Sequence, residues 1–180
     1  MRDPVLVRYV AIMLTIRIAT AADQESLGRF GAALMRQHHE ADPRRFMLVE
    51  NPEAGYGRFL VSPASEETSL VGVAVDAGKV IGYVYADIEG TNWMEFRGPC
   101  GVVHDIYVDE TARRTGAGRA LMTAAIEWIR SKDRSQVVLM TKSGNERAQH
   151  LFTAVGFRST MIEMTLDFKH ELRRIVGENP

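Results

Sequence analysis

Residues Gly101–Arg130 read GVVHDIYVDETARRTGAGRALMTAAIEWIR. The stretch begins as an apolar strand, turns at Gly116 and Gly118, and continues as a helix with Leu121 and Trp128 on one apolar face. The first N–H groups of a helix have no partner within it and carry a partial positive charge, so a diphosphate is stabilised there. This order of strand, glycine-rich turn and helix predicts a binding site for a phosphorylated cofactor.

Spacing excludes two other glycine-rich phosphate sites. A dinucleotide fingerprint needs Gly or Ala three residues after Gly118, where Leu121 stands, and a P-loop needs Gly-Lys-Ser/Thr, which is absent. What remains is Arg113-x-x-Gly116-x-Gly118. The alternative is an ordinary glycine-containing turn between a strand and a helix.

A second motif follows about 30 residues after the first. It reads Asn145-x-x-Ala148-x-x-Leu151-Phe152-x-x-x-Gly156-Phe157. The two motifs in this order resemble the GNAT superfamily of acyl-CoA-dependent N-acetyltransferases, whose first signature is Gln/Arg-x-x-Gly-x-Gly/Ala. The resemblance covers roughly residues 68–168 and implies an α/β (α+β) fold, with a central mixed, mostly antiparallel sheet of six to seven strands flanked by about four helices.

The length and composition predict one domain. With 180 residues and 46% hydrophobic content, the chain is long enough for one buried core. We expect the domain to span residues 13–170, with tails at 1–12 and 171–180. Its net charge of -1 argues against broad electrostatic affinity for nucleic acid or an anionic membrane.

The charges are unevenly distributed along the chain. Residues 50–95 hold eight acidic and two basic side chains, whereas residues 97–174 hold thirteen basic and nine acidic ones. The first half suits a cationic amine and the second an anionic cofactor; solvated surface charge is the equally simple alternative.

Two features bear on the compartment. Arg8 and Arg17 interrupt the apolar run Val5–Ile18, which argues against a signal sequence or a membrane span. The single cysteine, Cys100, excludes an internal disulfide framework. We expect a cytoplasmic protein.

Periodicity and breakers place the remaining elements. The predicted strands are 14–18, 69–75, 80–87, 102–108, 136–141 and 157–166. The predicted helices are one after the capping box Thr20-x-x-Asp23 and those at 118–130 and 145–155, with a short helix or irregular segment running toward Pro52. Asp76-Ala-Gly-Lys79 predicts a hairpin turn. The long final strand leaves little room for a seventh, so we expect one long strand or exchange between subunits.

If the resemblance holds, the protein transfers acetyl from acetyl-CoA to a primary amine of a small molecule or peptide by direct attack in a ternary complex. Residues 113–119 would hold the pyrophosphate through backbone N–H groups, and residues 106–108 would pair with the pantetheine arm. Asn145 would hydrogen-bond the pantetheine or simply cap its helix. The residues assigned to CoA are Ile106, Tyr107, Val108, Arg113, Arg114, Thr115, Gly116, Ala117, Gly118, Arg119, Asn145 and Phe152.

Three catalytic tasks follow from the same resemblance. The backbone N–H of Val108 would polarise the thioester carbonyl. His104 is the predicted base, because a histidine titrates near neutral pH and some members carry one at this position; a core histidine satisfied by a neighbour is the alternative. Glu95 and Asp105, acting through water, are the other candidates for the base.

The general acid departs from the family pattern. Phe152 stands where many members have tyrosine, so the leaving thiolate would depart without full protonation, or water or Tyr107 would serve. This departure supports a rival interpretation, namely a catalytically weak acyl-CoA-binding sensor or regulatory module on the same fold.

Location along the chain nominates the acceptor site. We predict Phe30, His38 and Tyr83 as substrate-binding residues, with His39, Phe46 and Tyr85 as further candidates. His38 and His39 make a poor metal pair, since adjacent helical side chains point apart, so we expect no metal. The apolar final strand, together with family habit, predicts a homodimer.

Overall fold

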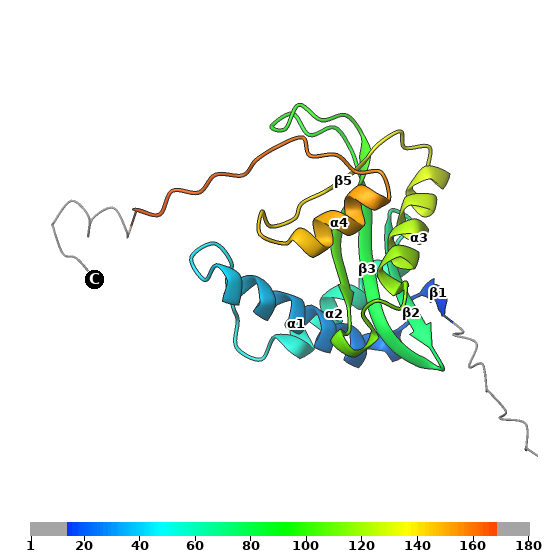
Figure 1. The fold of residues 1–180 in the computed structure, drawn as a ribbon. Coiled ribbons are helices and arrows are strands. Elements are labelled where there is room, and N and C mark those ends of the chain that lie inside the picture. The colour runs from blue at the N-terminus through cyan, green and yellow to red at the C-terminus, as the bar shows by residue number, and fades with distance from the viewer. Residues whose placement is uncertain (1–13, 169–180) are drawn as a thin grey trace, which may run out of the picture.

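A five-stranded sheet carries helices on both faces in the computed structural model, which describes residues 14–168 (Figure 1). The strands are β1 (Thr15–Ile18), β2 (Ser69–Asp76), β3 (Lys79–Glu89), β4 (Cys100–Val108) and β5 (Val137–Leu139). The helices are α1 (Gln24–Ala41), α2 (Pro52–Val61), α3 (Ala117–Ser131) and α4 (Glu146–Ala154). The predicted mixed α/β fold is confirmed. The predicted tails and the last domain residues, 1–13 and 169–180, lie outside the described residues.

The strands lie in chain order, β1-β2-β3-β4-β5. The first three pairs are antiparallel, and β4 and β5 are parallel because α3 crosses over between them. The predicted hairpin turn is confirmed, since Asp76 pairs with Lys79 and leaves Ala77 and Gly78 between the strands, both with positive φ. That conformation is the one required in a two-residue hairpin.

The predicted sixth strand, 157–166, is wrong for this structure. The chain is extended there but pairs with no strand among residues 14–168, so the described sheet has five strands rather than six or seven. Alternating side chains make a segment competent to form a strand, but a strand also needs a partner for its backbone N–H and C=O groups.

Two apolar cores fill the space between the sheet and its helices. One lies under α3 and α4 and includes Val103, Leu121 and Phe152; the other lies under α1 and α2 and includes Phe30 and Tyr83. No helix of the described residues is long and apolar enough to cross a membrane.

The capping box that begins the α1 region forms as predicted. The backbone N–H of Thr20 donates to Asp23 at 2.8 Å, and Asp23 also accepts two hydrogen bonds from Arg17, at 2.7 and 2.8 Å. Asp23 is almost fully buried, so these donors replace the water that its carboxylate loses on folding. They anchor α1 to β1 and thereby place α1 over the sheet.

Candidate active site

A β-bulge interrupts the pairing of β4 with β3. Tyr85 lies opposite Asp105 and the next residue, Ala86, lies opposite Val103, which leaves His104 as the extra residue. An inserted residue of this kind bends the strand and turns the following side chains to the other face. The inserted residue, His104, is the predicted base.

Backbone hydrogen bonds on the two sides of the bulge show the same reversal. The N–H of Gly101 donates to the carbonyl of Gln136 on the β5 side at 3.0 Å, whereas the N–H of Asp109 donates to the carbonyl of Ile81 in β3 at 2.9 Å. Gly101 and Asp109 are an even number of residues apart, so in a regular strand both N–H groups would point to the same edge. One inserted residue, His104, accounts for the switch.

The second half of β4 has an edge that β5 does not cover. β5 pairs only with residues 101–103 and ends at Leu139, opposite Val103. Because the N–H of Asp109 points toward β3, that of Val108 points to the opposite, uncovered edge. This edge can accept an extended ligand as an added strand, with Val108 as a backbone donor.

The glycine-rich loop lies at the end of the same edge. Gly116 has φ +92 and is the N-cap of α3, which begins at Ala117 with its first-turn N–H groups free of intrahelical partners. Thr115 donates from its hydroxyl to the carbonyl of Ala112 at 2.8 Å, which closes the turn. Arg114 and Arg119 are exposed beside it, so the loop combines backbone donors with positive charge.

The two sequence motifs meet at Gly118. A Cβ at this position would lie 3.3 Å from Leu151 of α4 and 3.8 Å from Val108 of β4. Asn145 caps α4 by accepting a hydrogen bond from the N–H of Ala148 at 3.3 Å, as its simpler interpretation predicted. The glycine-rich loop and the uncovered edge of β4 therefore adjoin each other and the Leu151 side of α4.

His104 lies among acidic and aromatic side chains of β3. Its Nε2 is 3.3 Å from Oδ2 of Asp87 and 3.7 Å from Oε1 of Glu89, and its ring is 5.0 Å from that of Tyr85. The imidazole is about one-third exposed. The bulge therefore places a ring nitrogen of His104 beside two carboxylates in a partly open position.

An arginine connects this cluster to the loop before β4. Arg97 donates to Glu89 at 2.6 Å and to Glu95 at 2.9 Å, and these hydrogen bonds raise the pKa of Arg97. Glu95 is therefore tied to the guanidinium rather than pointing to His104. The structure brings Glu89 within 3.7 Å of His104, and among the described residues Glu95 has its ion pair with Arg97.

Asp105 forms a second polar cluster on the same face as His104. It accepts hydrogen bonds from the hydroxyls of Tyr56, at 2.8 Å, and Tyr83, at 3.1 Å. Burial, reinforced by the Asp105 charge, raises the pKa of both tyrosines, so both remain donors at neutral pH. Tyr83 is fully buried, and its contribution to the site is to position Asp105.

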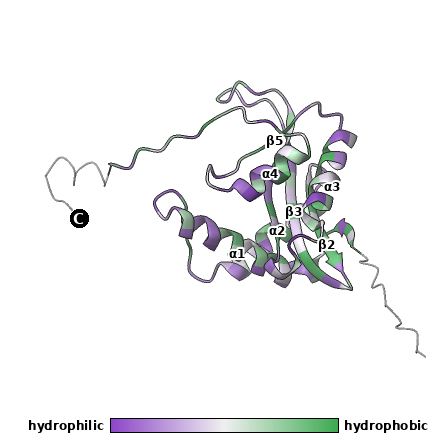
Figure 2. Cartoon of the chain, viewed as in Figure 1, coloured by the Kyte–Doolittle hydropathy of each residue, from purple (hydrophilic) through white to green (hydrophobic). Residues whose placement is uncertain are grey.

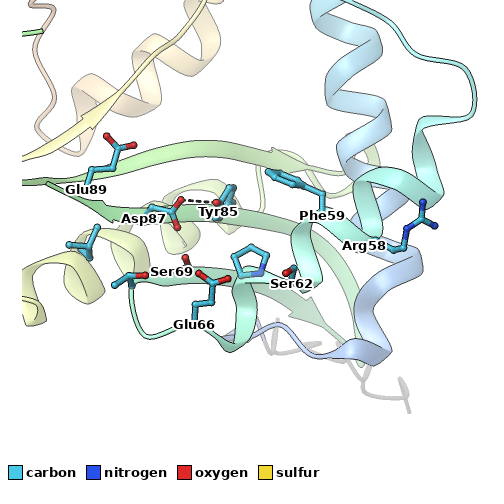
Figure 3. Close-up of a pocket in the computed structure, with 11 residues that line it drawn as sticks. Arg58, Phe59, Ser62, Glu66, Ser69, Tyr85, Asp87 and Glu89 are labelled. Carbon is cyan, nitrogen blue, oxygen red and sulfur yellow. Dashed lines mark hydrogen bonds between the residues drawn. The ribbon is translucent and has the colours of Figure 1, made fainter. Parts of the chain in front are cut away.

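A cavity of about 610 Å³ opens between α2 and β3 beside these groups. Tyr85 and Phe59 face it, edge to face with centroids 5.7 Å apart, and the Tyr85 hydroxyl donates to Asp87 at 2.6 Å (Figure 3). Glu66 lies across from Asp87, and Arg58 of α2 also lines the cavity (Figure 3). Aromatic walls with carboxylates suit an organic cation.

One atom of this cavity lacks a partner. Oδ1 of Asp87 is buried and makes no hydrogen bond within the described residues, although Oδ2 accepts from Tyr85. A buried carboxylate oxygen without a donor costs free energy, so a donor supplied by a ligand would be stabilising there.

Several predicted residues lie elsewhere. Phe30 is buried under α1 with its ring 5.5 Å from Tyr107, and Phe152 is buried against Phe157, 6.1 Å between centroids. The Nδ1 atom of His38 is hydrogen-bonded to the carbonyl of Leu34 on the same helix. Phe30 and His38 do not line the cavity.

Sequence reasoning missed Tyr56, Asp87 and Glu89. The period-two alternation of β3, Tyr83-x-Tyr85-x-Asp87-x-Glu89, was the signal that places Asp87 and Glu89 on one face with the two tyrosines. Tyr56 had no local signal, because its contact with Asp105 joins α2 to β4. Among residues 14–168, no group of three or more His, Cys, Asp and Glu side chains is arranged to hold a metal ion.

A family model described as the acetyltransferase (GNAT) family matches residues 30–157. The chain belongs to this family. Over 96 residues it is 33% identical to the mycothiol acetyltransferase of Thermobispora bispora, an alignment that covers 51% of this chain and 31% of that protein. The chain thus spans about a third of the length of the curated relatives it matches.

Solved structures share the acetyltransferase fold over most of the chain. A mutant of the BH1408 protein of Bacillus halodurans superposes with a TM-score of 0.74 at 26% identity and covers 86% of this chain and 99% of that one. The aminoglycoside N-acetyltransferase AAC(6')-Iy, in complex with CoA, superposes at 0.69 with 18% identity, covering 87% and 95%. At that identity the likeness concerns the fold.

Proposed function

We propose that this family member transfers the acetyl group of acetyl-CoA to a primary amine of a small molecule or peptide, by direct attack within a ternary complex. The observation that carries the proposal is the uncovered edge of β4, which begins at the bulge and leads to the N-terminus of α3. An extended arm that ends in a diphosphate matches this combination, because one end needs strand-like pairing and the other needs free N–H groups.

The cofactor-binding residues proposed from the sequence are kept. Residues 113–119 bind the pyrophosphate, and Ile106, Tyr107 and Val108 lie along the pantetheine. The N–H of Val108 faces the thioester oxygen, where it stabilises the negative charge of the tetrahedral transition state. Asn145 belongs to the α4 side of the same site, and Phe152, buried against Phe157, supports that side from the core.

The acceptor amine enters through the cavity between α2 and β3. Asp87 and Glu66 attract it as an ammonium, and Phe59 and Tyr85 contact its carbon skeleton. His104 then takes a proton so that the amine gains a nucleophilic lone pair. His104 and Val108 are four residues apart on one strand, about 13 Å, so the proton passes through water.

The leaving thiolate departs without a tyrosine donor. Phe152 has no ionisable group, and Tyr107 packs next to Phe30, where burial raises the pKa of its hydroxyl and makes proton transfer from it to the thiolate less favourable. A CoA thiol has a pKa near that of cysteine, about 8.5, so the thiolate is a tolerable leaving group with water as its eventual proton source.

The test compares His104→Ala with His150→Ala, an exposed histidine on α4 that is remote from the bulge. CoA release is followed with a diamine, an amino sugar and a peptide with a free α-amino group. We expect His104→Ala to lower kcat by about 10²- to 10⁴-fold, with acetyl-CoA affinity measured by calorimetry unchanged, and His150→Ala to be neutral.

Other outcomes would discriminate between the rival interpretations. Acetyl-CoA binding without amine-dependent CoA release would favour the catalytically weak sensor or regulatory module. Turnover that is unaffected by His104→Ala would remove His104 as the base and leave Asp105 or Glu95. Absence of acetyl-CoA binding would sink both interpretations. We also propose that the protein is cytoplasmic and forms a homodimer.

A further inference from the structure

The cavity between α2 and β3 lies far from the position at which the acetyl group would react. Its carboxylate Asp87 touches His104, with 3.3 Å between Oδ2 and Nε2. Val108, whose N–H faces the thioester in the proposed function, follows four residues after His104 on β4, which is about 13 Å along the strand. An amine held at Asp87 is therefore too far away to attack, because reacting atoms must approach to about 3–3.5 Å.

Acidic side chains form a row between these two places. The strands of the sheet consist mainly of hydrophobic residues (Figure 2). Glu89 and Asp87 nevertheless take alternate positions of β3, and Asp105 of β4 lies opposite Tyr85, the next position in that alternation (Figure 3). Alternate residues of a strand are about 7 Å apart. Negative charge therefore recurs at about this interval from the cavity toward Val108.

The row has carboxylate oxygens that a ligand can reach with a donor. Oδ1 of Asp87 is buried and has no hydrogen-bond donor among the described residues. Tyr56 and Tyr83 both donate to Oδ2 of Asp105, so neither of them occupies its Oδ1. A charged N–H donor forms the stronger kind of hydrogen bond with a carboxylate, and a buried oxygen without a donor costs free energy. An ammonium group therefore fits these positions.

The cavity end of the row is net negative. Three carboxylates and one guanidinium line it, and these belong to Glu66, Asp87, Glu89 and Arg58. Glu89 is paired with Arg97 at 2.6 Å, whereas Glu66 and Asp87 have no ion pair with a lysine or arginine within residues 14–168. The rings of Phe59 and Tyr85 lie beside them, with centroids 5.7 Å apart. Carboxylates next to aromatic rings favour an ammonium group on an apolar chain.

We propose that this cavity is a second cation subsite and that the acceptor is a linear aliphatic polyamine, held at Asp87 by one ammonium group while the amine at its other end reacts beside Val108. The inference rests on the proposed function, which fixes where the acetyl group lies. The methylene groups contact Phe59 and Tyr85, and Asp105 lies along the path. A compact monoamine cannot occupy both ends of the row at once.

The separation of the two ends sets the length of the acceptor. An extended chain advances about 1.2 Å per bond, so roughly 10–13 Å corresponds to about 8–11 bonds between the two nitrogens. Octamethylenediamine, with eight methylene groups, meets this requirement. Tetramethylenediamine, with four, is too short to bridge the row. The protein is therefore expected to select diamines by length as well as by charge.

The first test follows CoA release with octamethylenediamine and with aminooctanol, in which a hydroxyl replaces the second ammonium. We expect kcat/KM to be about ten- to a hundredfold higher for the diamine, the effect of one charge-assisted hydrogen bond to a buried carboxylate. Tetramethylenediamine should show no such advantage over aminobutanol. Asp87→Asn should abolish the advantage of the long diamine, whereas Glu67→Gln, outside the cavity lining, should preserve it. The ratio is the readout, because Asp87 also contacts His104.

The second test measures binding without turnover, by calorimetry of the full chain with the same two long acceptors in the absence of acetyl-CoA. We expect the diamine to bind at least about tenfold more tightly than aminooctanol, and Asp87→Asn to remove the difference while circular dichroism shows a folded chain. Equal affinities in the wild type would overturn the subsite, and an equal advantage for tetramethylenediamine would overturn the distance. Diamine-selective binding without CoA release from any acceptor would contradict acetyl transfer and support the cation subsite.

Discussion

The side chain of His104 shows how much one residue decides at this site. As the inserted residue of the bulge, it shares a face with Asp105, its neighbour in sequence, although neighbours in a regular strand point apart. In a regular strand without a bulge, Asp105 and Tyr107 would share the face of Val103 and point into the α3-side core. The bulge therefore belongs to the chemistry of the site as much as to the sheet.

Asp23 is the residue whose titration contributes most clearly to folding. The hydrogen bonds from Arg17, with those from Thr20, lower the pKa of Asp23 from 3.8 to about 2. The unfolded chain thus binds a proton more readily than the folded one between these two values. The stability from Asp23 is fully present above about pH 5 and is lost as the pH falls toward 2.

We therefore expect Asp23→Asn to cost about 2 kcal/mol of unfolding free energy at pH 7, and the difference from wild type to shrink below pH 4. Urea unfolding at several pH values measures both quantities. Glu25→Gln, an exposed carboxylate in the first turn of α1, is the control and should change stability little. A difference that stayed constant from pH 7 to pH 2.5 would contradict this account.

At the scale of elements, α1 and α2 pack closely because glycines face the contact. A Cβ on Gly28 would lie 2.2 Å from the carbonyl oxygen of Glu53 on α2, and this oxygen belongs to a helix backbone that cannot move aside freely. The close approach places Tyr56 within reach of Asp105 on β4. Glycine at this position thus contributes to the acceptor side of the site.

Gly28→Ala should destabilise the protein by about 1–3 kcal/mol, since the added methyl forces the two helices apart. Gly55→Ala on α2 is the matched variant, because its Cβ would meet nothing within 4 Å, and it should stabilise by up to about 1 kcal/mol through helix propensity. Thermal unfolding of both variants measures the contrast. Equal effects of the two substitutions would show that the helix contact is looser than described.

Across the whole molecule, the acceptor side and the cofactor side of the proposed active site differ in charge. The cavity between α2 and β3 presents Glu66, Asp87 and Glu89, whereas Arg113, Arg114 and Arg119 accompany the glycine-rich loop. Such a separation attracts a cationic acceptor and an anionic cofactor to different faces. It gives a physical basis to the uneven charge of the sequence halves.

Glu66→Gln should raise the KM of a dicationic amine about two- to fivefold at low ionic strength, with kcat nearly unchanged, because an exposed charge contributes through binding alone. Glu67→Gln removes the neighbouring charge, which does not line the cavity, and should leave KM unchanged. Steady-state kinetics at two salt concentrations measures both. A KM that is unchanged by Glu66→Gln would show that the acceptor amine binds elsewhere.

The sequence by itself determined the local parts of this protein. The strand, glycine turn and helix of residues 101–130, the capping box at Thr20 and the hairpin at Asp76–Lys79 depend on neighbouring residues, so short-range patterns were enough to predict them. The second motif and its N-cap at Asn145 belong to the same class. Family membership followed from these local features.

Only the tertiary structure decided which of these parts form the site. The placement of Asp87 beside His104, the contact of Tyr56 with Asp105 and the burial of Phe30 depend on register and helix packing between distant segments. Whether residues 157–166 pair with another strand also depends on distant segments, because alternation gives a segment the capacity to form a strand but does not specify its partner. Among the described residues this segment is unpaired. Pairing is a property of two surfaces, and one stretch of sequence specifies only one of them.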